Sequence, residues 1–314
     1  MKYLTTEDLN GNTFYLPLLE LKMLFDSAQK ILELEPFDHL STAQQWMFKL
    51  IEEAPEIHID LKKQQSEFDV IYNIALDYLK ASGVISPDVK VANNFIKANF
   101  TPYESLLLQE GSDGGLSLFF ALVSTLKFTF ETTSISANYK TKHDKEVKGY
   151  KNLEGIYLSN ENYEGCMIYT KEGGMLVFMQ SKNEPLQINS YEEFLAKTHE
   201  IIYDNDYEYG DMRMPVFYPE LALQLSPPTE MVVGLSANSK KLRQSSVFKQ
   251  FNMLSKIKLD AHGIVVETGA TMEIFTRGIS RQRFVVEENV FIYILTGEGE
   301  VVNSIYLDKE VYQF

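Results

Sequence analysis

The segment Leu116–Phe130 constrains the fold more than any other part of this sequence. It is apolar almost without interruption, and it is bounded by Gly114-Gly115 on one side and by Glu131-Thr132-Thr133 on the other. Its most apolar part, Leu116–Leu126, is too short to cross a bilayer and contains Ser and Thr. A short apolar run between turn residues is typical of a strand that is buried on both faces. The sequence therefore predicts a sheet with such a strand inside it.

The chain before this run predicts mostly helices, because its apolar residues recur at helical spacing. Ser41 and Gln44 have the spacing of a capping box, which begins a helix that ends before Pro55. We expect a further short turn over Tyr103–Leu108. The predicted helices lie between Pro17 and Pro36, between Ser41 and Pro55, over Phe68–Leu79 and over Val89–Phe100.

The chain after this run predicts mostly strands, with one helix over Tyr191–Tyr203. Lys171–Gly174 has the composition of a hairpin turn. No Pro/Gly/Ser-rich linker separates the helical part from the strand-rich part, so we expect a single α+β domain over residues 1–314. The predicted strands are Tyr163–Tyr169, Met175–Gln180, Met212–Tyr218, Leu221–Leu225, Ile257–Glu267, Phe284–Leu295 and Val301–Leu307.

Composition narrows the classes of partner. The chain has 29 Lys+Arg against 44 Asp+Glu, which gives a formal net charge of −15. Affinity for nucleic acids and for anionic membranes depends largely on Lys and Arg, so we expect neither as a partner. The first residues, Met1–Asn12, lack the pattern of a signal peptide. We therefore expect a cytoplasmic or nucleocytoplasmic protein, while a mature secreted form stays open. We also expect a monomer.

The residue types that carry catalysis or bind metals form no recognisable motif. Cys166 is the only cysteine, which excludes internal disulfides and zinc sites with two or more cysteines; we expect it to be a small buried side chain in a strand. We interpret the acidic run Asp204–Asp211 as a solvated loop. We expect no metal, no cofactor and no enzymatic activity. The histidines, which match no metal-binding pattern, are His39, His58, His143, His199 and His262.

Five segments in the right order along the chain resemble the serpin family. The longest of them is similar, without gaps, to the strand that leads into the serpin reactive loop, with Gly269 at the position of the loop hinge. We expect no counterpart of the family's first helix. The matching segments are Asn12–Pro17, Leu122–Phe128, Met214–Phe217, Ser255–Ala270 and Glu288–Tyr293.

The resemblance implies a serpin-like α+β fold with a helical N-terminal part, a large central mixed sheet and smaller packed sheets. It also implies a relation to serine protease inhibitors. In this family an exposed reactive loop baits a protease, and after cleavage the loop inserts as a new strand in the central sheet and traps the protease. Counting from Gly269, the nominal scissile position is Arg283, with Arg281 and Arg277 as alternatives. The loop residues implied are Gly269, Ala270, Thr271, Met272, Glu273, Arg277, Arg281 and Arg283.

This chain departs from the family pattern at positions that matter for insertion of the cleaved loop into the sheet. The segment after the hinge is bulky and includes Glu273, whose charge one register of insertion would bury without a partner. The stretch Gly269–Phe291 is shorter than is usual in the family. Leu16, Leu19 and Ser124 replace polar family residues where the sheet must open, and we interpret this seam as apolar packing.

These departures leave three functions open. The first is a non-trapping serpin relative that binds a protein partner, and the second is a short-loop inhibitor of a trypsin-like serine protease, whose acidic pocket would accept an arginine. The third is an enzyme of an unrelated class, which no catalytic motif supports.

Overall fold

The computed structural model describes residues 3–5, 13–110, 116–131, 135–141, 143–203, 206–217, 221–224, 226–260, 263–265 and 282–313. The chain divides into two units, and each unit consists of several chain segments. Unit 1 comprises Met1–Pro17, Lys127–Gln224 and Ser255–Phe314, and unit 2 comprises Leu18–Leu126 and Leu225–Leu254. None of the helices in the described ranges has the length and apolarity that a membrane crossing requires.

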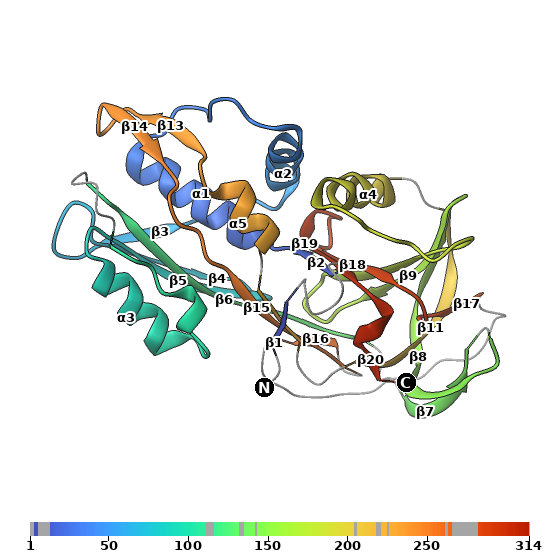
Figure 1. The fold of residues 1–314 in the computed structure, drawn as a ribbon. Helices are drawn as coiled ribbons and strands as arrows, with labels where there is room; N and C mark the ends of the chain where they lie inside the picture. Colours follow the sequence, from blue (N-terminus) through green and yellow to red (C-terminus); the bar gives the residue numbers. More distant parts are fainter. Residues whose placement is uncertain are drawn as a thin grey trace. The chain divides into compact units, whose positions relative to one another are not determined.

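In its described residues, unit 2 contains four helices, four strands of an eight-stranded sheet and a small hairpin (Figure 1). These four strands have the order β6-β5-β4-β3, and every pair among them is antiparallel. Its elements are α1 (Leu18–Leu32), α2 (Thr42–Glu53), β3 (Asp60–Lys63), β4 (Val70–Ala75), β5 (Leu79–Ser86), α3 (Val89–Asn99), a 3₁₀ turn (Glu104–Leu106), β6 (Phe119–Thr129, whose last residues belong to unit 1), α5 (Ser226–Val232), β13 (Ser236–Ser239) and β14 (Gln244–Val247).

Strand β6 is covered on both faces, as the apolar run Leu116–Phe130 predicts. Helix α1 packs through Ala28 and Ile31 against one face, which includes Phe120. Helix α3 packs through Ala92 and Ile96 against the other face. Alternate residues of β6 point to opposite faces, so an apolar residue at almost every position is what this strand needs.

The predicted capping box at Ser41 is confirmed. The Ser41 Oγ accepts a hydrogen bond from the Gln44 N–H, and the Gln44 side chain accepts one from the Ser41 N–H. Helix α2 begins at the next residue and ends at Glu53. Helices α1 and α3 also confirm their predicted segments, and the 3₁₀ turn Glu104–Leu106 confirms the turn expected there.

The predicted helix over Phe68–Leu79 is wrong. This segment forms β4 and the start of β5, joined by a tight turn in which Leu76 and Leu79 exchange backbone hydrogen bonds. The buried residues of β4 are Val70, Tyr72 and Ile74, which alternate with the half-buried Ile71 and with exposed residues. Because these are β-branched or aromatic residues, strand pairing prevails over the helical spacing that the same segment also satisfies.

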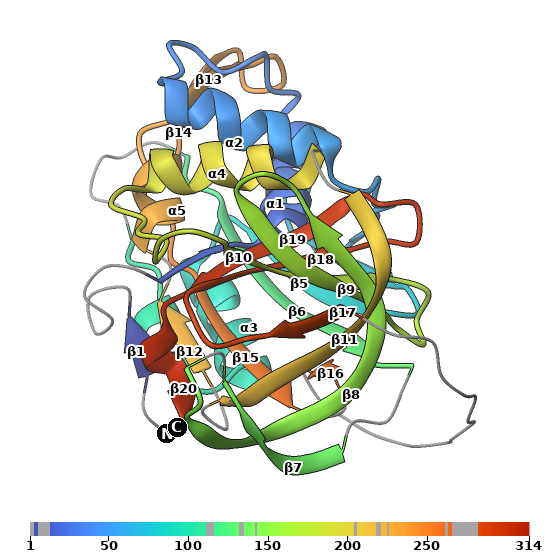
Figure 2. The ribbon, with the colours of Figure 1, turned by 90° about the vertical axis from the view of Figure 1, so that its right-hand side faces the viewer.

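Unit 1 contains a ten-stranded sheet, which Figure 2 shows strongly curved, with one helix across it. The order is β17-β11-β8-β9-β10-β18-β19-β2, with β7 on β8 and β20 on β11. Its elements are β1 (Tyr3–Thr5), β2 (Phe14–Leu16), β7 (Ile135–Lys140), β8 (Glu146–Ser159), β9 (Tyr163–Tyr169), β10 (Met175–Ser181), α4 (Tyr191–Tyr203), β11 (Asp206–Phe217), β12 (Leu221–Gln224), β15 (Leu254–Asp260), β16 (Gly263–Val265), β17 (Gln282–Val285), β18 (Val290–Leu295), β19 (Val301–Leu307), a 3₁₀ turn (Lys309–Val311) and β20 (Tyr312–Gln313).

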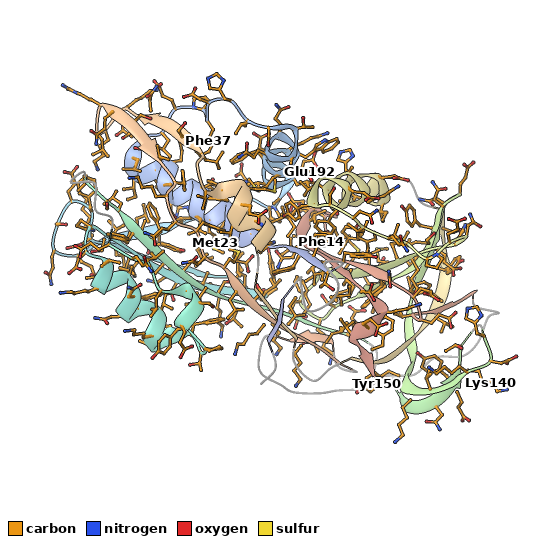
Figure 3. The ribbon with its side chains drawn as sticks, viewed as in Figure 1. Phe14, Met23, Phe37, Lys140, Tyr150 and Glu192 are labelled. Carbon is orange, nitrogen blue, oxygen red and sulfur yellow. The ribbon has the colours of Figure 1, made fainter. Side chains whose placement is uncertain are left out.

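Helix α4 confirms its predicted segment and packs on this sheet through aromatic stacking. The Phe194 ring lies parallel to that of Phe291 in β18, with 6.0 Å between the centroids, and stacks on Phe14 in β2 at 5.4 Å. Figure 3 shows Phe14 inside unit 1 beneath this helix. The N-terminal strand, the helix and the C-terminal strands therefore share one apolar core.

The acidic run Asp204–Asp211 is not a loop over its described part. Residues Asp206–Asp211 are the first half of β11 and pair with β8. The expectation of a solvated acidic loop is wrong here, because Tyr207 and Tyr209 alternate with the acids at strand spacing. Cys166 is buried in β9, as expected.

Candidate functional site

The candidate site is the segment that connects β16 to β17, together with its two anchors in unit 1. Arg283 lies within β17, whose backbone pairs in parallel with β11 opposite Asp211. The other expected loop residues lie outside the described residues: Gly269, Ala270, Thr271, Met272, Glu273, Arg277 and Arg281. The structure therefore shows how both ends of the segment are held.

The first anchor is a hairpin. The single predicted strand Ile257–Glu267 is wrong, because the chain reverses between Asp260 and Gly263 and forms β15 and β16. Asp260 and Gly263, which lie on either side of this reversal, belong to residue types that favour turns. This signal is missed when the segment is interpreted as one long strand. On its other edge, β16 pairs antiparallel with the end of β6, with Gly263 opposite Thr129 and Val265 opposite Lys127.

The end of β6 is clamped by the turn between β9 and β10. Thr129 donates to the Glu172 carboxylate twice, from its N–H at 2.6 Å and from its hydroxyl at 2.8 Å. The Thr129 carbonyl accepts from the Lys171 N–H at 2.8 Å. Hydrogen bonds to a charged acceptor are stronger than neutral ones, so this turn fixes the strand end beside β16.

Replacing Glu172 with alanine is expected to lower the free energy of unfolding by about 2 kcal/mol, because two charge-assisted hydrogen bonds are lost and the Thr129 N–H loses its acceptor. Urea unfolding measures this. Lys171→Ala is the matched control, because it keeps the N–H that bonds to Thr129, and its effect is expected within about 0.5 kcal/mol. Equal effects for the two variants would contradict the clamp.

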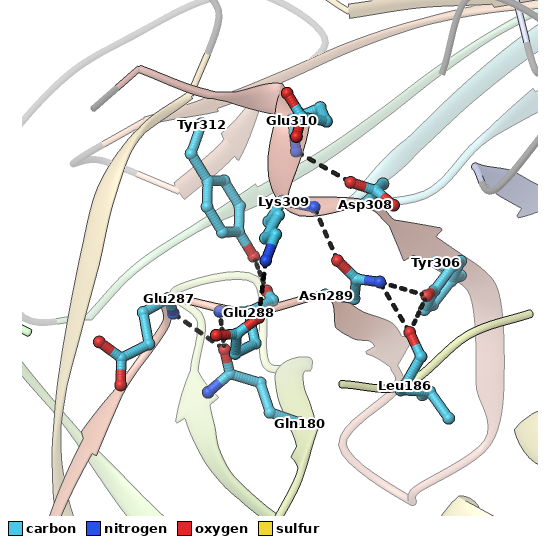
Figure 4. A network of polar contacts seen from close by, with 10 residues as sticks. All are labelled: Gln180, Leu186, Glu287, Glu288, Asn289, Tyr306, Asp308, Lys309, Glu310 and Tyr312. Atoms are coloured by element: carbon cyan, nitrogen blue, oxygen red, sulfur yellow. Dashed lines mark hydrogen bonds and ion pairs between the residues drawn. The ribbon is translucent and has the colours of Figure 1, made fainter. Parts of the chain in front are cut away.

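The second anchor is Gln180, a buried side chain at the end of β10. Its Oε1 accepts from the N–H groups of both Glu287 and Glu288 at 2.9 Å (Figure 4). Its Nε2 donates to the Val285 carbonyl at 2.8 Å. The connection between β17 and β18 is thus held by one amide. The prediction of one strand over Phe284–Leu295 is wrong because of this connection, which separates the two strands.

Asn289 extends the same network (Figure 4). Its Nδ2 donates to the Leu186 carbonyl at 2.7 Å and to the Tyr306 hydroxyl at 2.9 Å, and its Oδ1 accepts from the Lys309 N–H at 2.9 Å. The Tyr306 hydroxyl also donates to Leu186 at 2.8 Å. Burial raises the pKa of Tyr306, so this hydroxyl stays a donor. The sequence analysis identified neither Gln180 nor Asn289 as a functional residue. The signal that could have indicated Gln180 is its place as a polar residue at the end of the apolar predicted strand Met175–Gln180.

The seam where a serpin sheet opens is not wholly apolar here. Leu16 and Leu19 are buried, but the Ser124 hydroxyl donates to Glu20 Oε1 at 2.8 Å. The interpretation of this seam as apolar packing is therefore wrong at Ser124, because its hydroxyl bonds to a carboxyl group from α1. No cluster of possible metal ligands occurs within the described residues.

No family model matches this sequence, and no curated protein is similar to it. Solved structures are similar. A thermophilic serpin, tengpin, in its native state matches with a TM-score of 0.51 and 11% identity, over 94% of this chain and 88% of that one. Human thyroxine-binding globulin complexed with its ligand matches with a TM-score of 0.51 and 10% identity, over 96% of this chain and 93% of that one.

A serpin from the trematode Schistosoma haematobium matches less well, with a TM-score of 0.41 and 13% identity, and 70% of this chain covers 61% of that one. The chain thus spans less than two thirds of that serpin's length. The matches to tengpin and thyroxine-binding globulin confirm the expected fold. At their level of identity they concern the fold alone.

Proposed function

We propose that this chain, which has a serpin fold, binds a protein partner through the segment between β16 and β17 and does not trap a protease by loop insertion. The observation that carries the proposal is the register of β16 on β6. If β16 were extended along β6 without a change of register, each further loop residue would pair with a defined residue of β6. The register therefore supports an inference about which loop residues an inserted strand would bury.

Extending β16 in its present register would bring Glu273 opposite Phe119. Directly opposed residues on antiparallel strands share a face, and Phe119 faces α3. A carboxylate placed there would lose its hydration without gaining a partner, which is costly. Insertion would therefore stall before it reached the far end of β6. The apolar cluster on that face consists of Val84, Val89, Ala92, Ile96, Phe119 and Ala121.

The arginines support a partner with an acidic pocket. Arg277, Arg281 and Arg283 lie close together in a chain with a net charge of −15, and a guanidinium pairs well with a carboxylate. A trypsin-like protease has such a pocket. Arg283 pairs with β11, and a protease cannot bind a paired strand, so we propose Arg277 and Arg281 as the contact residues.

One observation favours the alternative, a short-loop inhibitor that does trap. Over Phe119–Leu126, β6 pairs with β5 on one edge, and none of the described strands pairs with its other edge there. This edge could accept an inserting strand. Melting the cleaved unchanged chain and cleaved Glu273→Ala side by side separates the two functions. A trapping inhibitor shows a rise in melting temperature in both, whereas a chain blocked by the Glu273 charge shows it only in Glu273→Ala.

Binding is tested by calorimetry with trypsin whose catalytic serine is replaced by alanine, which cannot cleave the chain. We expect reversible binding that weakens at least about tenfold, or roughly 1.4 kcal/mol, in the double variant Arg277→Ala/Arg281→Ala. Arg243→Asn is the control, because it removes an exposed arginine of unit 2 and keeps a residue that tolerates its positive φ of 54°. Equal affinity for both variants, or no binding by the unchanged chain, would contradict arginine-directed recognition.

A further inference from the structure

Unit 2 contains a carboxyl group that the proposed function does not use. Glu20 lies in the first turn of α1, and its Oε1 accepts the Ser124 hydroxyl from β6. The residue keeps some exposed surface. Its Oε2, however, is shut off from solvent and has no hydrogen-bond partner among the described residues. One half of the carboxyl group is therefore bonded to the sheet, and the other half is buried without a bond.

Tyr72 of β4 carries a second buried polar atom in unit 2. Its hydroxyl is buried and likewise has no hydrogen-bond partner in the described part of the chain. A Cβ on Gly83 would lie 2.4 Å from the Tyr72 ring and 2.6 Å from its hydroxyl oxygen, so the ring lies across β5 where that strand has no side chain. The charge of Glu20 contributes to raising the pKa of Tyr72, after burial, which is the larger cause. Unit 2 thus contains two buried polar atoms without a hydrogen bond, Glu20 Oε2 and the Tyr72 hydroxyl, and the charge of the first acts on the second.

Within the described residues, the influences on the Glu20 carboxyl are burial, the Ser124 hydroxyl and its own backbone, and none of them is a cation. On its own helix, Lys22 donates to the Ile51 carbonyl at 3.2 Å, and Asp26 is acidic. From the described part of the sheet, Tyr72 of β4 is a titratable side chain on which the charge of Glu20 acts. The residues paired beside Tyr72 and Ser124 in β5 are Gly83 and Ala81, which do not titrate. The buried face of α2 is apolar and consists of Ala43, Met47, Leu50 and Ile51.

We propose that Glu20 is a pH-sensitive latch: its protonated carboxyl holds α1 to β6, and loss of the proton releases that contact. As a neutral acid, Glu20 accepts the Ser124 hydroxyl at Oε1 and places no negative charge on the buried Oε2. As a carboxylate it has a buried negative oxygen and no cation, and it is stabilised only when α1 and the sheet separate enough to admit water. The latch biases the opening of unit 2 itself, and it does not depend on the proposed partner.

The sign of the pH dependence follows from burial. Burial raises the pKa of Glu20 above its ordinary 4.5, and the hydrogen bond from Ser124 partly opposes this. The folded state therefore binds this proton more tightly than the unfolded state. The stabilisation is fully present below pH 4.5 and is lost as the pH rises through the raised pKa. For each unit by which the pKa is raised, the equilibrium constant between the closed and open states changes about tenfold in total.

The test is hydrogen exchange of the β5 and β6 amides between pH 4 and pH 8, in the unchanged chain and in Glu20→Gln. Comparing the two proteins at each pH removes the intrinsic pH dependence of exchange. We expect the unchanged chain to lose protection relative to Glu20→Gln as the pH rises. Glu52→Gln, which neutralises an exposed acid on α2, is expected to behave like the unchanged chain. Parallel profiles for the unchanged chain and Glu20→Gln would overturn the proposal.

A second variant covers the case in which Glu20→Gln does not fold. Ser124→Ala removes a hydrogen bond that lowers the pKa of Glu20, so the pH at which protection is lost should move upward. A purely structural role for Ser124 would reduce protection equally at every pH. A pH midpoint that is unchanged or moves downward would overturn the latch.

Discussion

Replacing Gln180 with alanine is expected to lower the free energy of unfolding by about 3 kcal/mol. The change leaves the buried N–H groups of Glu287 and Glu288 and the carbonyl of Val285 without their partner, and it opens a cavity at a side chain that is 2% exposed. A buried donor that loses its acceptor costs about 1 to 3 kcal/mol. The end of β17 would loosen with it, so trypsin should then cleave after Arg283, which the intact strand protects.

Gln45→Ala is the matched control for Gln180→Ala. Gln45 is also a glutamine whose side chain donates to a backbone carbonyl, that of Leu40, but it is exposed. Its loss is expected to change the free energy of unfolding by less than about 0.5 kcal/mol. Urea unfolding of both variants, with mass spectrometry of tryptic fragments, measures the two effects. Similar stability of the two variants, with Arg283 still protected, would mean that Gln180 does not hold the second anchor.

Gly174→Val is expected to lower the free energy of unfolding by a similar amount, about 3 kcal/mol, by overpacking the turn between β9 and β10 that clamps the end of β6. A Cβ at this position would lie 2.2 Å from the ring of Phe128, near the end of β6, and 2.6 Å from the Leu295 carbonyl oxygen. The backbone oxygen cannot move without disturbing β18. We therefore expect a large loss of thermal stability, measured by calorimetry.

The neighbouring glycine provides the control for this variant. Gly173 has a φ of 81°, and a Cβ there would meet nothing within 4 Å. Gly173→Asn keeps a residue type that tolerates this conformation and is expected to cost less than about 1 kcal/mol. If Gly173→Asn lowered the stability more than Gly174→Val, the backbone conformation of the turn, and not its close packing, would determine how much this turn contributes to stability.

Local sequence signals predicted the helices with caps and clear ends. Ser41 and Gln44 accept hydrogen bonds from each other's backbone N–H groups within one turn of helix. The segment Tyr191–Tyr203 has apolar residues along one face, as a helix that packs on a core requires. These features depend on residues a few positions apart. The same is true of the hairpin between β9 and β10, whose turn composition is unambiguous.

Strands with two compatible patterns were harder to predict. Phe68–Leu79 satisfies helical spacing as well as the alternation that β4 adopts, and pairing with β5 decides between them. The division of Ile257–Glu267 into β15 and β16 depends on the edge that β6 provides. A partner strand that is distant in sequence cannot be read from the segment itself.

The candidate site depends even more on distant contacts. Gln180 bonds to Glu287, 107 positions away, and Glu20 to Ser124, 104 positions away. The sequence indicated that Ser124 and Glu273 break the family pattern, but it did not indicate that a carboxyl group from α1 reaches Ser124. Only the assembled sheet brings these groups together.

The most direct test of non-trapping is incubation with active trypsin, followed by boiling, a denaturing gel and a thermal melt of the cleaved chain. We expect cleavage after Arg277 or Arg281, no complex that survives boiling and an unchanged melting temperature, because Glu273 would prevent the loop from inserting beside β6. A protease complex that survives boiling, or a large rise in melting temperature after cleavage, would contradict it.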